Sequence, residues 1–296
     1  MRERTRAVAA TGIAIALAML GQTAWAVPTA VDDLSLTGAT AIWDVTNDYD
    51  YGTSGAPCMS STGGYTPVEG GELDGMTDAF DGGLYLHVGS GVFNDDDGTG
   101  NYDAVGQQLT VGPTEMKGLQ VRRTERALQG SPTLRSLVRL SNPTNDDIRA
   151  TITWDSALGA DDSEKTRASS ASRTRRTTED DDWIVTSDSA TSPSDPPLIF
   201  AVYGPGDVRV TNRSVPWVPE DPDPGDDSNE GCVVFRFRVK VPANSTRFLL
   251  FFTEMRDTNE AAIAKADRFG NVRMASPLMD GISNEVARRI LNWNLG

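Results

Sequence analysis

Apolar and polar residues alternate along several short stretches of this chain, most clearly between positions 134 and 154. In the second half of that stretch, 148–154, the apolar residues Ile, Ala and Trp alternate strictly with Arg and Thr. A period of two is typical of a β-strand with one buried face. The joint at 141–147 is rich in Pro, Asn and Asp, which favour a turn. The sequence therefore predicts an antiparallel hairpin.

Similar patterns predict strands elsewhere, at 39–45, 84–88, 107–111, 118–123, 183–186, 198–203 and 232–241. In the last of these, Phe235 and Phe237 alternate with Arg236 and Arg238, so one face is expected in the core and the other exposed and basic. The run 248–252 has no alternation, which favours a strand covered on both faces. The Gly- and Ser-rich stretch between 46 and 81 is expected to form loops.

The period changes near the C-terminus. Asp257 and Glu260 have the spacing of a capping box, 261–269 favours helix, and Gly270 is expected to end that helix in a left-handed conformation. A second helix is expected from about position 283, because three apolar residues recur every four positions: Ile282, Val286 and Ile290. The predicted fold class is mainly β, an antiparallel β-sandwich with two short C-terminal helices.

The first 26 residues have the form of a secretory signal peptide. Three Arg residues precede an apolar run, and the triplet Ala-Trp-Ala that ends at Ala26 fits signal peptidase. A membrane anchor is the alternative, but the run is shorter than the ~20 residues of a spanning helix. We expect cleavage after Ala26 and a secreted or periplasmic protein, with a single β-sandwich domain over 27–296 whose helical cap covers about 257–293. An N-terminal sequence from unprocessed protein would contradict this.

The chain is acidic, with 42 Asp and Glu against 27 Lys and Arg and a formal net charge of −15. Cleavage of the leader would remove three Arg and one Glu, so −15 would become −17. This sign disfavours a nucleic-acid partner, because phosphate binding draws its affinity from Lys and Arg. The polar stretches 159–182 and 219–230 are interpreted as long surface loops. A basic run at 165–176 is interpreted as pairing with the acids that follow it, or as docking an anionic glycan or acidic partner.

Clustered acidic residues are the basis for a calcium-site hypothesis, because Ca²⁺ takes several oxygen ligands from flexible loops. The candidate ligands fall in two segments: Asp74, Asp78 and Asp81, and Asp95, Asp97, Asn101 and Asp103. Neither segment has EF-hand spacing, and Asp in turns also bonds its own backbone. A melting temperature that millimolar calcium and chelators leave unchanged would argue against a structural ion.

Two cysteines remain after the predicted cleavage, Cys58 and Cys232. In an oxidising compartment an even pair favours one disulfide between distant parts of the chain. Two free buried thiols are the alternative. The mass shift on reduction and alkylation distinguishes them.

The chain has a single histidine, His87, which removes whole classes of mechanism. Zinc sites with two or three histidines are excluded within one chain. A Ser-His-Asp triad would depend on His87, and the sequence has no GxSxG elbow and no Gly-rich phosphate loop. Because His87 neighbours Tyr85 on a predicted strand, we interpret it as structural.

Several phrases together resemble segments of uncharacterised secreted bacterial β-rich proteins: DAFDGGLYLHV, LRSLVRLSNPTNDDIRATITW, DDWIVTSD, VYGPG, VPANSTRFLLFFTE and ILNWNL. The resemblance covers most of the chain from about position 74. It implies export and a β fold, and it carries over no activity or site residue. The chain departs from the pattern at 169–177, which is longer and more basic here.

These observations favour a secreted, non-enzymatic β-sandwich protein with a binding or extracellular structural role. Its partner would be an extracellular ligand or surface component, with no membrane span after leader removal and no cofactor other than the calcium discussed above. The alternative is a carbohydrate-active enzyme or sugar-binding module. Two carboxylates suffice for glycoside hydrolysis, and four tryptophans are candidates for stacking on sugar rings: Trp43, Trp154, Trp183 and Trp217. Trp154, however, is expected on the core face.

Overall fold

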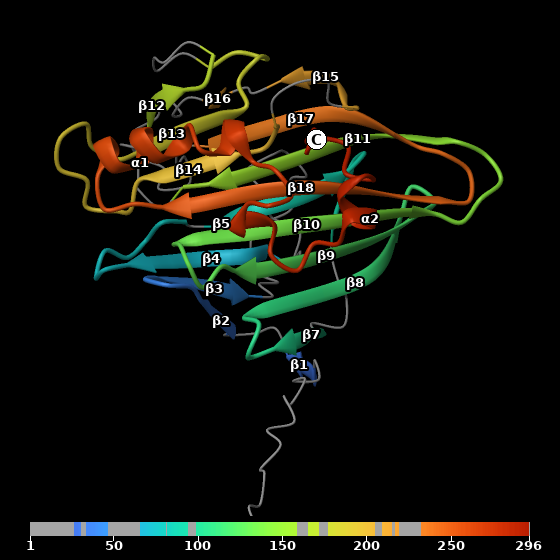
Figure 1. Ribbon diagram of the computed structural model, residues 1–296, viewed down its shortest axis with the longest axis horizontal. Coiled ribbons are helices and arrows are strands. Elements are labelled where there is room, and N and C mark those ends of the chain that lie inside the picture. The colour runs from blue at the N-terminus through green and yellow to red at the C-terminus, as the bar shows by residue number, and fades with distance from the viewer. Residues whose placement is uncertain are drawn as a thin grey trace, which may run out of the picture.

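The structure is a computed structural model of the chain (Figure 1). It describes residues 27–30, 34–46, 66–80, 82–93, 99–158, 165–171, 177–204, 209–214, 217–218 and 232–295. These residues form two nine-stranded antiparallel sheets that pack against each other. The predicted fold class is therefore confirmed. Among the described residues, every helix is too short or too polar to span a bilayer.

The first sheet, called sheet I, carries the helical segment on its outer face. Its strands in spatial order are β1 (Val27–Ala30), β7 (Thr99–Asp103), β8 (Gln108–Met116), β9 (Leu119–Ala127), β10 (Thr133–Asn142), β18 (Ser245–Met255), β14 (Leu198–Ala201), β13 (Trp183–Ser187) and β12 (Lys165–Ser169). The side chains at 248–252 of β18 are buried on both faces, as the apolar run predicts.

The second sheet, called sheet II, has one basic face. Its strands in order are β15 (Thr211–Ser214), β17 (Cys232–Val241), β11 (Ile148–Ala157), β5 (Gly82–Val88), β4 (Thr66–Leu73), β3 (Ala41–Thr46) and β2 (Leu34–Thr37), with β16 (Trp217–Val218) beside β17 and β6 (Gly91–Val92) beside β5. In β17 the phenylalanines are buried, and Arg236, Arg238 and Lys240 are exposed. The predicted core and basic faces are confirmed.

The core between the sheets contains both stacked rings and a buried ion pair. Trp154 of sheet II stacks on Phe251 of sheet I with 4.2 Å between ring centroids. The guanidinium of Arg123 lies 4.3 Å from the centroid of the Trp154 ring and pairs with Glu125, which also accepts a hydrogen bond from Ser136. All five side chains are almost fully buried, so the strands that carry them are held face to face.

The hairpin predicted at 134–154 is wrong in its pairing. Both arms are strands, but β10 pairs with β9 and β18 in sheet I, whereas β11 pairs with β5 and β17 in sheet II. The joint is an arch that crosses the sandwich. Each arm has an apolar side, and the two sides face each other through the core. Alternation reports which face of a strand is buried, and it does not report which strand lies beside it.

A second arch from β17 to β18 lies next to the first, at the same end of the sandwich (Figure 1). Asn142, which is buried, joins them. Its side-chain Nδ2 donates to the carbonyls of Val241 and Pro242 at 3.0 and 3.2 Å, and its Oδ1 accepts from the N–H and hydroxyl of Thr144. Asn244 N–H also donates to Thr144 at 3.0 Å.

Two stretches expected to be loops contain strands. The stretch 46–81 includes β4, which pairs with β3, and the polar stretch 158–183 includes β12 at the edge of sheet I. β4 is rich in Gly, and β12 carries Lys, Thr, Arg and Ser, so neither has the apolar alternation that marks a strand. Backbone pairing with a neighbouring strand supplies the stabilisation that their side chains do not indicate.

The C-terminal segment forms a second apolar layer on sheet I. It contains α1 (Asn259–Ala266), η2 (Phe269–Asn271), η3 (Pro277–Met279) and α2 (Asn284–Ala287). Figure 1 shows α1 over β13 and β14, and its buried alanines pack there against Trp183 and Val185. The first predicted helix is confirmed. The second begins near the predicted position, but α2 is only four residues long and ends before Ile290.

Two details of the predicted first helix are wrong. The N-cap is Thr258, whose hydroxyl accepts from Ala261 N–H at 3.1 Å, and not Asp257. The helix ends at Ala266, and Gly270 lies within the 3₁₀ turn η2 without a left-handed conformation. Thr and Asp cap helices about equally well, so their order along the chain could not decide between them.

Candidate functional site

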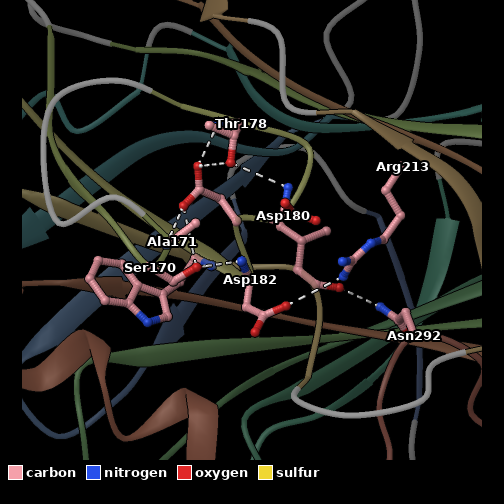
Figure 2. Close-up of polar contacts among 10 residues, drawn as sticks. Ser170, Ala171, Thr178, Asp180, Asp182, Arg213 and Asn292 are labelled. Carbon is pink, nitrogen blue, oxygen red and sulfur yellow. Dashed lines mark hydrogen bonds and ion pairs between the residues drawn. The ribbon is translucent and has the colours of Figure 1, made fainter.

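Asp182 is fixed between two strands of sheet I. It directly precedes β13, and its carbonyl oxygen accepts from the backbone N–H groups of Val202 and Tyr203, which follow β14, at 3.1 and 3.3 Å. Its carboxyl points to Arg213 of β15, with 3.4 Å between Oδ1 and Nη1 (Figure 2). The pair therefore connects β13 of sheet I to the edge strand of sheet II.

Burial raises the pKa of Asp182 to about 6. The Arg213 guanidinium opposes this shift, and the neighbouring carboxylates of Asp181 and Asp180 add to it. About a quarter of each side chain of the pair is exposed, 27% for Asp182 and 24% for Arg213. Asp182 is therefore a carboxyl that changes charge just below neutral pH at a partly open position.

Tyr203 lies under Arg213. The guanidinium is 4.9 Å from the centroid of the Tyr203 ring, whose edge-to-face partner in the core is Phe237 at 5.4 Å. The Tyr203 hydroxyl is buried and has no hydrogen-bond partner among the described residues. Burial raises the pKa of Tyr203 well above its usual value, so the hydroxyl keeps its proton.

Asp181 has a structural role beside this pair. Its buried carboxylate accepts from the N–H groups of Ala171 and Thr178, both at 2.6 Å, and from the hydroxyls of Ser170 and Thr178 (Figure 2). A carboxylate that accepts from four donors within the protein needs no external ligand to complete its hydrogen bonding. The acidic run 179–182 therefore splits into exposed residues, a turn-forming Asp181 and the ion-paired Asp182.

Asn292 holds the C-terminal segment against sheet I. Its Nδ2 donates to the carbonyls of Val202 and Leu250, each at 2.7 Å, and its Oδ1 accepts from Leu250 N–H at 2.9 Å. The side-chain amide thus occupies the place of a strand residue beside Leu250, where β14 no longer pairs with β18. Trp293 follows and donates its indole N–H to the same Leu250 carbonyl.

A cavity of about 430 Å³ lies beside the C-terminal segment, at Trp293, Asn294 and Leu295. Its lining combines two guanidiniums, two carboxamides and an indole with apolar groups, from Arg209, Met274, Asn284, Ala287, Arg288, Trp293, Asn294 and Leu295. The backbone N–H of Arg209 donates to Leu291 at 2.7 Å, and its guanidinium donates to the carbonyls of Arg288 and Ile290. These bonds fix Arg209 against the last turn of α2.

The described carboxylates do not neutralise the charge at this cavity. Burial and the nearby charge of Arg247 lower the pKa of Arg209. Among the described residues, no carboxylate pairs with Arg209, Arg247 or Arg288, whereas the neighbouring Arg289 pairs with Glu285 at 2.7 Å. Unpaired guanidiniums at a concave surface favour an anion.

The residues predicted as calcium ligands are only partly described. Asp81, Asp95 and Asp97 lie outside the described residues. Asp74 and Asp78 are exposed in turns with positive φ, and Asn101 is exposed on β7. No group of three or more His, Cys, Asp or Glu in the described ranges is arranged to hold a metal ion.

Asp103 shows what these acidic turns do locally. Its Oδ1 accepts from the N–H groups of Val105 and Gly106 at 3.1 and 3.0 Å, which closes a turn. Calcium binding stays a prediction, and so does the disulfide. Cys58 lies outside the described residues, and the side chain of Cys232, the first residue of β17, is not described.

His87 is buried on β5 and pairs with Asp155 on the adjacent β11, with 2.9 Å between Nε2 and Oδ1. Tyr85 and Thr153 on the same outer face of sheet II are also buried. A histidine paired to a buried carboxylate among covered side chains fits the structural role expected from the sequence. Of the sugar-stacking candidates, Trp43, Trp154 and Trp183 are buried and unable to present a ring, and the side chain of Trp217 is not described.

Sequence reasoning did not find the residues of the cavity or of the Asp182 pair. Arg209 and Arg288 are 79 positions apart, and Asp182 and Arg213 are 31 apart, so no local motif joins them. The run that contains Asp182 was interpreted as a solvated loop. The sequence gives one weak indication of the cavity: Trp293 and its neighbours form an apolar segment at the end of an otherwise polar stretch.

No family model matches the chain, and no curated protein matches it. Similar solved structures include a protein named as a kojibiose phosphorylase from the human microbiome, with a TM-score of 0.47, 8% identity, and coverage of 84% of this chain and 34% of that one. Heparinase III has a TM-score of 0.45 at 8% identity, covering 78% of this chain and 38% of that one. The chain thus spans about a third of the length of these two proteins.

A galactose mutarotase related enzyme from Lactobacillus acidophilus is also similar, with a TM-score of 0.38 and 6% identity. There the match covers 77% of this chain and 98% of that one. The names of all three proteins refer to carbohydrates. At TM-scores below 0.5 these similarities assign neither a family nor a function to this chain.

Proposed function

We propose that this protein is an exported, non-enzymatic binding protein that takes an anionic ligand of sugar size in the cavity lined by Arg209, Arg288 and Trp293. One observation carries the proposal. Two guanidiniums that pair with no described carboxylate line the same 430 Å³ cavity, in a chain whose net charge is −15. Leaving positive charge unpaired in an acidic protein is most simply explained by an external anion.

The lining favours an acidic sugar over a simple inorganic anion. A guanidinium binds a carboxylate through two parallel hydrogen bonds. The carboxamides of Asn284 and Asn294 can both donate to and accept from hydroxyl groups, and the partly exposed Met274 adds apolar surface. The volume falls within the ~300–1,000 Å³ of small-molecule sites. A uronic acid offers a carboxylate, hydroxyls and an apolar ring face in one molecule.

Binding is favoured over catalysis because the described carboxylates of Asp181 and Asp182 already have other roles. Asp181 is saturated by its four donors, and Asp182 faces Arg213. Glycoside hydrolysis requires a second carboxyl placed across the sugar bond from the first. Among the described residues, none accompanies Asp182 in that way.

The proposal is tested by Arg288→Gln, because Arg288 lines the cavity and its side chain forms no hydrogen bond or ion pair with another described residue. Glucuronate and galacturonate should raise the melting temperature of the wild-type protein, and glucose and galactose should not. The substitution should raise the Kd for the acid sugars at least about tenfold, since a hydrogen bond to a charged group contributes about 1.5–3 kcal/mol.

Arg289→Gln is the matched control. It removes the same charge from the next residue, which pairs with Glu285 and does not line the cavity. Its Kd should stay within about twofold of the wild-type value. Equal affinity for acidic and neutral sugars, or equal losses in the two variants, would refute the proposed site.

The second candidate is a carbohydrate-active enzyme, and the observation that favours it is the pKa of Asp182, about 6. A carboxyl that titrates near neutral pH is suited to proton transfer. A panel of polysaccharides and aryl glycosides tests this reading. Turnover that disappears in Asp182→Asn would replace the binding proposal, and ligand uptake without product would support it.

A further inference from the structure

The outer face of sheet II has a covered end and an open end. At the covered end, Tyr85, His87 and Val234 are buried. At the open end, the outward side chains of β17 are Arg236, Arg238 and Lys240, all exposed. Successive outward residues of a strand lie about 6.8 Å apart, because each residue rises about 3.4 Å. The open end therefore presents a regular row of positive charge.

The strands beside β17 do not neutralise this row. Arg238 lies opposite Thr151 on β11 and Thr211 on β15, and Arg236 lies opposite Thr153 and Ser214. Lys240 lies opposite another cation, Arg149, which is also exposed. Like charges placed directly opposite each other destabilise an antiparallel pair.

Within the described ranges, one member of the row has an acidic partner. Lys240 pairs with Asp147 at 2.6 Å. In the part of the chain that the structure describes, no carboxylate pairs with Arg149, Arg236 or Arg238. The strip formed by Arg149, Arg236, Arg238 and Lys240 is thus a surface whose three guanidiniums form no ion pair with a described carboxylate, although the charge of Arg149 also acts on Asp147. The protein as a whole has a net charge of −15.

The spacing of the basic side chains on β17 indicates which kind of ligand matches the strip. An extended polypeptide has the same two-residue repeat as β17, because both follow the geometry of a β-strand. Carboxylates on alternate residues of such a segment would face successive basic groups without a change of register. Each arginine can then bind one carboxylate through two hydrogen bonds.

We propose that this basic strip docks an extended acidic polypeptide segment in which carboxylates alternate with uncharged residues. The strip is separate from the cavity and its proposed ligand. The acidic segment belongs to another molecule. Its affinity depends on its opposite charge and on the match between its two-residue repeat and the spacing of the basic side chains. Because the strip is exposed, its contacts are sensitive to ionic strength.

The test uses two synthetic peptides of identical composition and the full chain at physiological salt. One peptide alternates Glu and Thr, and its block isomer carries all Glu before all Thr. The alternating peptide should bind at least about tenfold more tightly, because only its carboxylates match the row in register. Arg236→Gln combined with Arg238→Gln should weaken the alternating peptide at least about tenfold.

The control is Arg139→Gln combined with Arg273→Gln, which removes the same charge from exposed positions outside the strip. It should change the affinity less than about twofold, because exposed charges beyond a Debye length are screened. Arg288→Gln should also leave peptide binding unchanged. The proposal for the strip can therefore be refuted without refuting the proposal for the cavity, and the cavity proposal can be refuted without refuting the strip.

Equal affinity for the two isomers would overturn the proposal, since it would show unspecific attraction of polyanions. Equal losses in the strip variant and the control variant would overturn it in the same way. A third contradicting result is binding of alginate, a polymer of uronic acids, that depends on Arg236 and Arg238 while the alternating peptide does not bind. That outcome would assign the strip to an anionic glycan.

Discussion

At the residue scale, Asn292 replaces a strand residue with one side chain. Its amide donates to the carbonyls of Val202 and Leu250 and accepts from Leu250 N–H. Asn292→Asp keeps the shape but removes both donors and buries a charge. We expect a loss of at least about 3 kcal/mol of unfolding free energy at pH 7, since each buried group left unpaired costs about 1–3 kcal/mol.

Urea unfolding measures this loss. Asn271→Asp, at an exposed position of the same C-terminal segment, is the control and should change stability by less than about 0.5 kcal/mol. Because the introduced carboxyl is buried, its pKa should be raised, and part of the lost stability should return at acidic pH. A variant as stable as the control would show that the amide does not hold the C-terminal segment.

Asp182 predicts a pH dependence at the same scale. Its pKa is about 6 in the folded chain and 3.8 as an ordinary Asp, so the folded state binds more protons between these values. Its contribution to stability is fully present below pH 3.8 and is lost as pH rises through 6. The loss is no more than ~3 kcal/mol and is reduced by solvent screening.

Urea unfolding of wild type and Asp182→Asn at pH 4 and pH 7 isolates this contribution. The amide does not titrate, so the stability of the variant relative to wild type should improve between pH 4 and pH 7. The attraction of Arg213 for the ionised carboxylate is already included in the pKa of about 6, so losing it does not change that sign. Parallel pH profiles would show that the raised pKa is wrong.

Single residues were the hardest part to predict from the sequence. The alternation that marks β9 gives no warning that Arg123 and Glu125 face the core, because both look like ordinary polar residues between Thr and Arg. Their burial depends on each other and on the Trp154 ring, which belongs to the other sheet. Asp182, Arg209, Arg213 and Arg288 were missed for the same reason, since their partners are distant in sequence.

At the element scale, the two arches decide the topology. Asn142 bonds to Thr144 within its own arch and to Val241 and Pro242 in the other. Asn142→Ala should cost about 2–4 kcal/mol, because it leaves several buried backbone groups without partners. The measurement is urea unfolding.

Asn145→Ala is the matched control in the same turn. Asn145 is exposed and bonds only to the Asn244 side chain, at 3.0 Å. Its replacement should change stability by less than about 0.5 kcal/mol. Similar losses in both variants would mean that Asn142 does not join the arches.

Strand positions were largely predictable, and strand partners were not. β5, β9, β13, β17 and β18 all lie where period-two or fully apolar runs place them. β10 pairs with β18 although more than 100 positions separate them in the sequence, and no residue pattern in either strand identifies its partner. β4 and β12 were missed because Gly-rich and polar strands lack the apolar face on which the prediction depends.

At the scale of the whole molecule, the arrangement of charge matters more than its total. A net charge of −15 is sufficient to explain solubility. The arginines without a carboxylate partner among the described residues, however, include Arg209 and Arg288 at the cavity beside α2 and Arg236 and Arg238 on the outer face of β17. Export, the Cys58–Cys232 disulfide and calcium binding remain predictions from the sequence, with the tests given above.

The most direct test of the account is a nuclear magnetic resonance titration of the wild-type protein with galacturonate. The side-chain amide signals of Asn284 and Asn294, which line the cavity, should shift in a saturable way, and those of the exposed Asn145 and Asn212 should not. Galactose should leave all four unchanged. Unchanged cavity signals with galacturonate, or equal shifts with galactose, would contradict an anion site at Arg209 and Arg288.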